Sequence, residues 1–201
     1  MAQEKRRKKP SSRIYASGDS PHTVDVNVVD VPESKMVVIA DRCAITDNEF
    51  ILEFAFWYRL APRDSVVRVE VPITAVAQVY LNTVQYHHLL RTSLTQQKIQ
   101  PTPLIEQVPD RQPVSMFWAN LLAIANTGIE AALDWSFLSP SLLHAASIAK
   151  RAVTARDIVP VLSVRSTTPL VLAILNYVEG LLPAIAERLG NPIAQTSGSA
   201  P

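Results

Sequence analysis

Histidine and cysteine side chains are the first candidates for metal binding or nucleophilic chemistry in this sequence. The chain of 201 residues has one cysteine, Cys43, and four histidines, His22, His87, His88 and His144. A protein zinc site needs three or four such side chains converging on one ion. His87 and His88 are neighbours on a predicted helix and point about 100° apart, so they do not form a two-ligand face. We expect no metal and no cofactor, with His87 as a hydrogen-bonded helix residue and Cys43 as a small buried apolar residue.

Carboxylates gather only around one predicted turn and strand. Asp41, Asp47, Glu49 and Glu53 are close in sequence. Glu49 and Glu53 alternate with apolar residues, and this alternation places them on the solvent-facing side of an antiparallel sheet. The sequence therefore predicts surface charges here rather than a paired-carboxylate site.

Motifs of common enzyme classes are also missing from the sequence. Five glycines in the whole chain nearly exclude a glycine-rich phosphate loop. There is no Gly-x-Ser-x-Gly elbow and no zincin helix. No catalytic or cofactor-binding residue is predicted, and an enzyme with an unrecognised site remains the second alternative function.

The stretch from residue 48 to 92 is the predicted structural centre of the first half. Aromatic and leucine side chains alternate along the strand between Phe50 and Tyr58, with Leu52, Phe54 and Phe56 on the same face. Further strands are predicted at 23–31, 36–45 and 65–71, joined by short turns. A helical stripe follows Pro72, from 73 to 94. These elements predict an antiparallel four-stranded sheet covered by one long helix.

Residues 31–90 resemble a family of short bacterial proteins of unknown function. The resemblance lies in the strand around Glu49–Phe54, a proline turn, the valine-rich strand 67–72 and the helix after it. It implies the strand–turn–strand–turn–helix arrangement and no activity.

Four prolines between residues 97 and 113 predict a semi-rigid connector rather than regular structure. The expected organisation is a disordered basic tail at 1–21, a sheet with a helix at 22–96, a linker at 97–114, a second unit at 115–190 and a loose tail at 191–201. The sequence shows no obvious internal repeat.

The second unit is predicted to be mainly helical, which makes the whole chain α+β. Residues 116–135 and 142–153 favour helices, and 157–165 favours a strand that Pro160 would place at a sheet edge or at a bulge. The segment 169–189 has two interpretations. We expect a strand at 170–175, so that a strand or hairpin occupies 157–175, followed by a helix from 181; the alternative is one helix with Pro183 inside it.

The surplus of apolar residues in 116–153 leads to the functional prediction. A helix that is apolar nearly all round is buried, at an interface or at a membrane. The leading function is therefore a non-enzymatic assembly or protein-interaction module, with a second copy of the chain or another protein as partner. The candidate interaction residues are Phe117, Trp118, Leu121 and Leu122.

The N-terminal tail supplies the first alternative function. Residues 1–13 carry six basic side chains and one acidic one, a net charge of 6 − 1 = +5, although the whole chain is only +1. Weak contact with nucleic acid or an anionic membrane surface would use Lys5, Arg6, Arg7, Lys8 and Lys9. No apolar run is free of strongly polar residues over a bilayer-spanning length, so no transmembrane span and a cytoplasmic location are expected.

Overall fold

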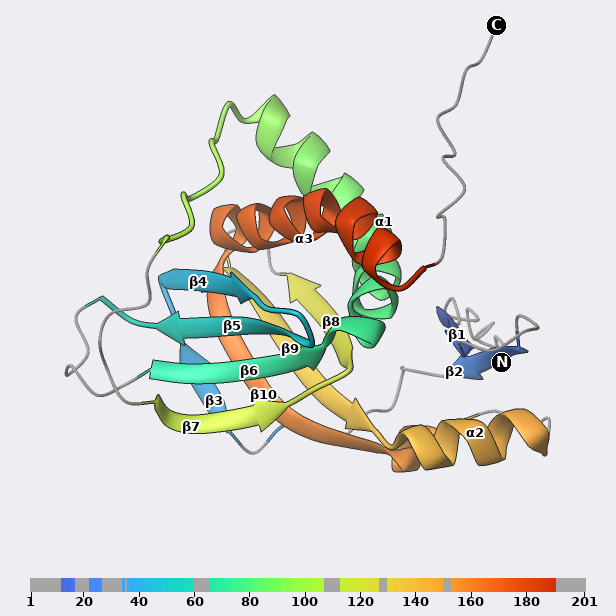
Figure 1. The fold of residues 1–201 in the computed structure, drawn as a ribbon. Coiled ribbons are helices and arrows are strands. Elements are labelled where there is room, and N and C mark those ends of the chain that lie inside the picture. The colour runs from blue at the N-terminus through green and yellow to red at the C-terminus, as the bar shows by residue number, and fades with distance from the viewer. Residues whose placement is uncertain are drawn as a thin grey trace, which may run out of the picture.

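The computed structural model describes residues 12–16, 22–26, 34, 36–59, 66–106, 113–126, 130–149 and 153–190. The fold is α+β, as the sequence predicted (Figure 1). Of the predicted disordered tail, residues 12–16 form a strand and the rest lies outside the described residues. The elements in chain order are β1 (Ser12–Ala16), β2 (His22–Val26), β3 (Val37–Ile39), β4 (Arg42–Asp47), β5 (Ile51–Trp57), β6 (Val66–Pro72), α1 (Ile73–Gln96), β7 (Pro113–Trp118), β8 (Leu121–Asn126), β9 (Glu130–Leu138), α2 (Pro140–Ile148), a 3-10 turn η2 (Ala155–Asp157), β10 (Ile158–Thr167) and α3 (Thr168–Arg188).

Two four-stranded sheets form the body, with strand orders β4-β5-β6-β7 and β3-β10-β9-β8. Both sheets are mixed, because β7 pairs parallel with β6 and β3 pairs parallel with β10. The predicted single antiparallel sheet is therefore wrong in three respects. The strand predicted at 23–31 overlaps β2, which pairs with β1 in a separate two-stranded sheet. The predicted strand 36–45 is two strands in different sheets, and the fourth strand beside β6 comes from beyond the long helix.

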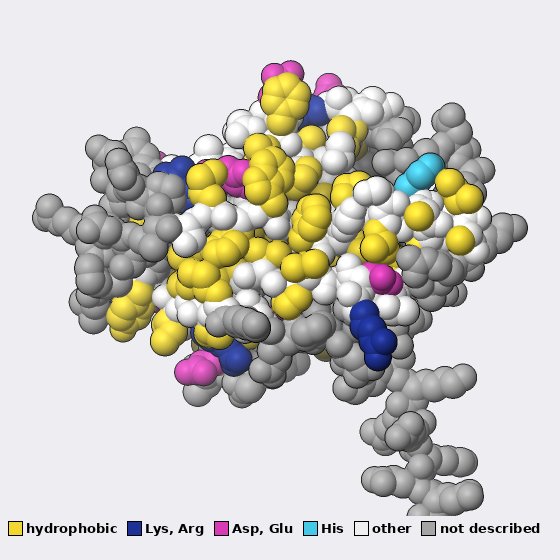
Figure 2. Space-filling view, turned by 90° about the horizontal axis from the view of Figure 1, so that it is seen from below, with side chains coloured by type: hydrophobic (Ala, Val, Ile, Leu, Met, Phe, Trp, Pro, Cys, Tyr) yellow, Lys and Arg dark blue, Asp and Glu magenta, His cyan; other side chains and the backbone are white. Residues whose placement is uncertain are grey.

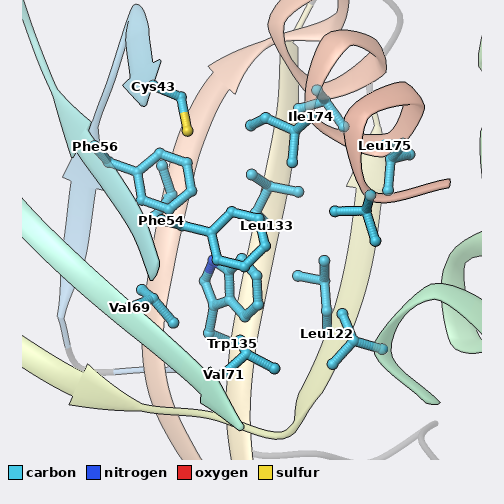
Figure 3. Close-up of a cluster of buried hydrophobic side chains, with 14 of the residues drawn as sticks. Cys43, Phe54, Phe56, Val69, Val71, Leu122, Leu133, Trp135, Ile174 and Leu175 are labelled. Atoms are coloured by element: carbon cyan, nitrogen blue, oxygen red, sulfur yellow. The ribbon is translucent and has the colours of Figure 1, made fainter. Parts of the chain in front are cut away.

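The core lies between the facing sides of the two sheets (Figure 3). Phe54 and Phe56 of β5 meet Trp135 of β9, with ring centroids 5.0 and 6.4 Å from the Trp135 ring. All three side chains are buried. For Phe54 and Phe56, the alternation along the predicted central strand indicated this. Phe50, expected on the same face, is instead 71% exposed, because the chain turns at Asn48 before β5 begins.

Helix α1 confirms the predicted helical stripe. It begins after Pro72, and the residues that it buries recur at three- and four-residue spacing. Helices α1 and α3 lie across one end of the two sheets, and β3 and β7 lie toward the opposite end (Figure 1).

The helix predicted at 116–135 is wrong, because these residues form β7, β8 and the first part of β9. Buried strands have long apolar runs, and such runs cannot be distinguished from a buried helix by periodicity. The unit 115–190, predicted to be mainly helical, therefore contains most of β7 and all of β8, β9 and β10, besides helices α2 and α3. The predicted helix at 142–153 corresponds to α2, which ends at Ile148.

The segment 169–189 adopts the alternative interpretation, a single helix. Thr167 is the N-cap of α3, Pro169 occupies its first turn and Pro183 lies inside it. An internal proline costs about 3 kcal/mol. Burial of residues on both sides of it, including Leu175, Val178 and Ile185, outweighs this cost at about 1.5–3 kcal/mol for each fully buried large side chain. Strand β10 is central rather than at an edge, and Pro160 lies at a register shift in its pairing with β9.

The structure reveals a repeat that the sequence did not show. The first unit is β3-β4-β5-β6-α1 and the second unit is β7-β8-β9-β10-α3. Strands β4 and β5 begin at positions 42 and 51, and β8 and β9 begin at positions 121 and 130, so the two starts are spaced alike in both units. Helices α1 and α3 begin at positions 73 and 168. The two helices are therefore further apart in the sequence than β4 is from β8, or β5 from β9. The second unit is longer because it carries an insertion between β9 and β10, and this insertion contains α2.

The residue pairs between neighbouring strands are also equivalent in the two units. Phe54 pairs with Ile45 and Val69 in the first unit, and the equivalent Leu133 pairs with Ile124 and Val164 in the second. The pairs that join the units also correspond: Val69 with Phe117, and Val164 with Val38. Each unit therefore contributes its first strand to the sheet of the other.

The chain crosses between the sheets at two equivalent positions, Ala40-Asp41 and Ala119-Asn120. Both alanines are buried, and their N–H groups donate to the carbonyls of Arg165 and Glu70, at 2.9 and 3.0 Å. A small side chain suits this place, because the backbone passes directly from one packed sheet to the other.

Candidate functional site

The residues with metal-binding or nucleophilic potential do not converge. Cys43 is fully buried in the core, and burial raises the pKa of its thiol, so the thiolate needed for nucleophilic attack is disfavoured. His88 and His144 are exposed on different helices. Within the described ranges no three His, Cys, Asp or Glu side chains are placed to hold a metal ion.

Three of the four carboxylates near the first turn make separate contacts, and Glu49 is exposed. Asp47 pairs with Arg188 at the end of α3, with the closer nitrogen–oxygen distances at 2.7 and 2.9 Å. Glu53 pairs with Arg68 at 3.2 Å, and Asp41 accepts the backbone N–H of Arg59. These contacts hold elements together, and they do not form a paired-carboxylate site.

Within the part of the chain that the structure describes, five polar side chains meet between α1 and α3 and join the two units. We call this group the interhelix cluster; its members are Tyr80, His87, Arg91, Asn176 and Glu179. The Tyr80 hydroxyl donates to the Glu179 carboxylate at 2.7 Å and lies 3.1 Å from His87 Nδ1. His87 Nε2 lies 2.8 Å from the Asn176 side-chain oxygen, and Arg91 bridges Asn176 and Glu179.

Burial and charge set the protonation of this cluster. Burial lowers the pKa of His87, with the Asn176 contact opposing that shift. Burial would raise the pKa of Glu179, but hydrogen bonds from Tyr80 and Arg91 hold it below its usual value. Burial and the Glu179 carboxylate raise the pKa of the Tyr80 hydroxyl. Both Glu179 oxygens are engaged inside the cluster, so the arrangement connects the helices rather than offering a free acid or base.

The four predicted interaction residues have different environments. Leu121 and Leu122 are buried, and Phe117 packs against the core. Trp118 is half exposed at the end of β7. The apolar surplus that suggested an interface is thus largely absorbed by the core, and Trp118 is the residue of the four that stays available at the surface.

An exposed apolar surface lies on the two exchanged strands. Met116 and Trp118 of β7 are 52% and 50% exposed, and Val37 and Ile39 of β3 are 55% and 67% exposed. The two pairs occupy equivalent positions in the two units. We call these four residues the edge-strand surface. Seen from below, the molecule gathers hydrophobic side chains over this side and shows few charged ones (Figure 2). Both strands carry consecutive apolar residues, at 37–39 and 116–118, so sequence alternation gave no signal for this surface.

Two further predictions concern charge and membranes. The polyanion-contact residues Lys5, Arg6, Arg7, Lys8 and Lys9 lie outside the described residues. Among the described helices α3 has the length and hydropathy of a membrane span. Its apolar residues Leu170–Leu175 are buried against the sheets, as in the core helix of a globular protein.

Comparison of the chain with protein-family models, with curated proteins and with solved structures gave no match. The resemblance of residues 31–90 to short bacterial proteins therefore stays a prediction, and function must be argued from the chain itself.

Proposed function

We propose that this protein is a non-enzymatic interaction module that self-associates through the edge-strand surface. The observation that supports this is the exposure of four large apolar side chains, Val37, Ile39, Met116 and Trp118, each by half or more. Monomeric proteins rarely expose contiguous apolar patches of large area, and such patches commonly mark interaction sites.

The backbone at these residues supports the same function. Strands β3 and β7 are edge strands of their sheets. An edge strand presents unpaired N–H and C=O groups, which favour the addition of a strand from another chain. The combination of apolar side chains and available backbone donors suits a protein partner better than a small molecule. Trp118 is the expected anchor, because large aromatic residues dominate interface energetics.

Analytical ultracentrifugation of the intact chain between about 1 and 100 µM tests this proposal. We expect an oligomer that dissociates on dilution. Trp118→Ala should weaken the free energy of association by about 1 kcal/mol or more. Leu89→Ala is the matched control, because Leu89 is also a large exposed apolar residue but lies on α1. A monomer of 22.1 kDa at every concentration would overturn self-association.

A further inference from the structure

We infer that this chain is a fused dimer, in which the first and second units bind each other as two separate subunits would. The interface is the one between the units, and it is distinct from the edge-strand surface. The partner that each unit fits is the other unit, which has the same β-β-β-β-α order.

The first support for a fused dimer is the exchange of strands between the two units. The sheet of β4, β5 and β6 is completed by β7, and the sheet of β8, β9 and β10 is completed by β3. Helix packing is exchanged as well, because α1 contacts β8 and α3 contacts β4. Each unit thus supplies a strand and a helix surface that the other lacks.

The core is shared in the same manner. Phe54 and Phe56 of the first unit pack against Trp135 of the second, and all three are buried. Removal of the second unit would expose the inner face of β4–β6 to water. A unit without a partner would therefore expose an apolar face that folded monomers seldom tolerate.

The interhelix cluster makes the pairing selective for unlike units. Tyr80, His87 and Arg91 all belong to α1, and Asn176 and Glu179 both belong to α3.

The equivalent positions on the other helix are apolar. Leu175, Leu182 and Ala186 of α3 replace the three α1 residues, and Leu81 and Val84 of α1 replace the two α3 residues. Pairing two first units would leave Arg91 and His87 without these acceptors, and pairing two second units would leave Glu179 without its donors. His87 is buried, so the loss of its acceptor disfavours pairing of two first units, and the partly exposed Arg91 and Glu179 each lose an ion pair in like-with-like association.

Cleavage between the units tests the fused dimer. A protease recognition sequence is inserted between Asp110 and Arg111, and the purified protein is cut under native conditions. We expect the two fragments to elute together at the mass of the uncut chain and to separate only in denaturant. The melting temperature of the cut protein should also fall more on tenfold dilution than that of the uncut protein, since unfolding of the cut protein includes separation of the two fragments. Fragments that separate under native conditions at micromolar concentration would overturn the inference.

Charge exchange in the cut protein tests the selectivity. Glu179→Arg should weaken fragment association at least tenfold, and the double variant Arg91→Glu/Glu179→Arg should recover part of that loss. Glu187→Arg, a substitution of the same type at an exposed position on α3, is the control and should leave association unchanged. Circular dichroism of each uncut variant confirms folding before cleavage. Equal effects of Glu179→Arg and Glu187→Arg, or no recovery in the double variant, would contradict the role of the cluster.

Discussion

Asp41 and Asn120 perform the same structural task in the two units. Asp41 Oδ1 accepts the Arg59 N–H at 2.7 Å, and Asn120 Oδ1 accepts the Leu138 N–H at 2.8 Å. The two acceptors occupy equivalent positions of the repeat, and so do the two donors. The backbone N–H groups of Asp41 and Asn120 also donate to equivalent carbonyls, those of Trp57 and Ser136, at 3.2 and 3.1 Å. Each side chain fixes the point where the chain leaves one sheet for the other.

The two positions should nevertheless respond differently to exchange of amide and carboxylate. Asn120 also donates from Nδ2 to the Leu138 carbonyl at 2.7 Å, a bond that a carboxylate cannot make. Asn120→Asp should therefore lower the free energy of unfolding by about 1–3 kcal/mol, because two acceptors would face each other in a half-buried place. Asp41→Asn keeps the acceptor and should cost less than about 1 kcal/mol. Urea unfolding of both variants measures the difference, and equal losses would contradict this assignment.

The crossing alanines should tolerate little extra volume. Ala119→Leu and Ala40→Leu each enlarge a side chain where the backbone passes between packed sheets, and each should cost about 1–3 kcal/mol. Ala184→Leu on the exposed side of α3 is the control and should stay within about 0.5 kcal/mol. Thermal melts that rank Ala184→Leu with the other two would show that the crossings are not tightly packed.

Two phenylalanines close together in the sequence provide a test of the core. Phe54→Ala removes a buried ring that contacts Trp135, and should lower the free energy of unfolding by about 3–5 kcal/mol. Phe50→Ala removes an exposed ring at the turn before β5, and should change it by about 0.5 kcal/mol or less. Chemical denaturation measures both free energies of unfolding. A larger loss for Phe50→Ala than for Phe54→Ala would contradict the assignment of Phe54 to the core-facing side of this strand.

Stability should fall as pH decreases because of His87. Burial lowers the pKa of this imidazole in the folded protein, so the unfolded chain takes up the proton at a higher pH. The full contribution is present above the unfolded pKa of about 6.5, and it is lost as pH falls from there toward the folded pKa. Urea unfolding at pH 7.5 and 5.5 should show a smaller decrease for His87→Gln than for the intact protein. His88→Gln, at the exposed neighbour, should retain the decrease; identical behaviour of the two variants would exclude His87 as the source.

The first unit was more predictable from sequence than the second. Strand β5, strand β6 and helix α1 follow clear two-residue and 3.6-residue periods, so local pattern and final structure agree. Strands β8 and β9 are rich in alanine and leucine, and packing against the other sheet overrides that preference.

The repeat was hidden because equivalent core positions carry different side chains. Phe54 corresponds to Leu133, and Phe56 corresponds to Trp135, so burial is retained while residue identity changes. One local signal was present: the pattern Ala-Asp/Asn-x-x-Ala-Ile occurs at 40–45 and again at 119–124. The interhelix cluster gave no such signal, since its members come from two helices that are far apart in the sequence.

Among the described residues, helix α2 has no counterpart in the first unit, and it lies within the insertion between β9 and β10. Its His144 and Ile148 are exposed, so it offers a surface that the first unit does not have. A partner that recognises α2 would find one site on each molecule. A partner that recognises the features shared by β3 and β7 would find two related sites. The ratio in which a partner binds at saturation would therefore identify which side of the protein it uses.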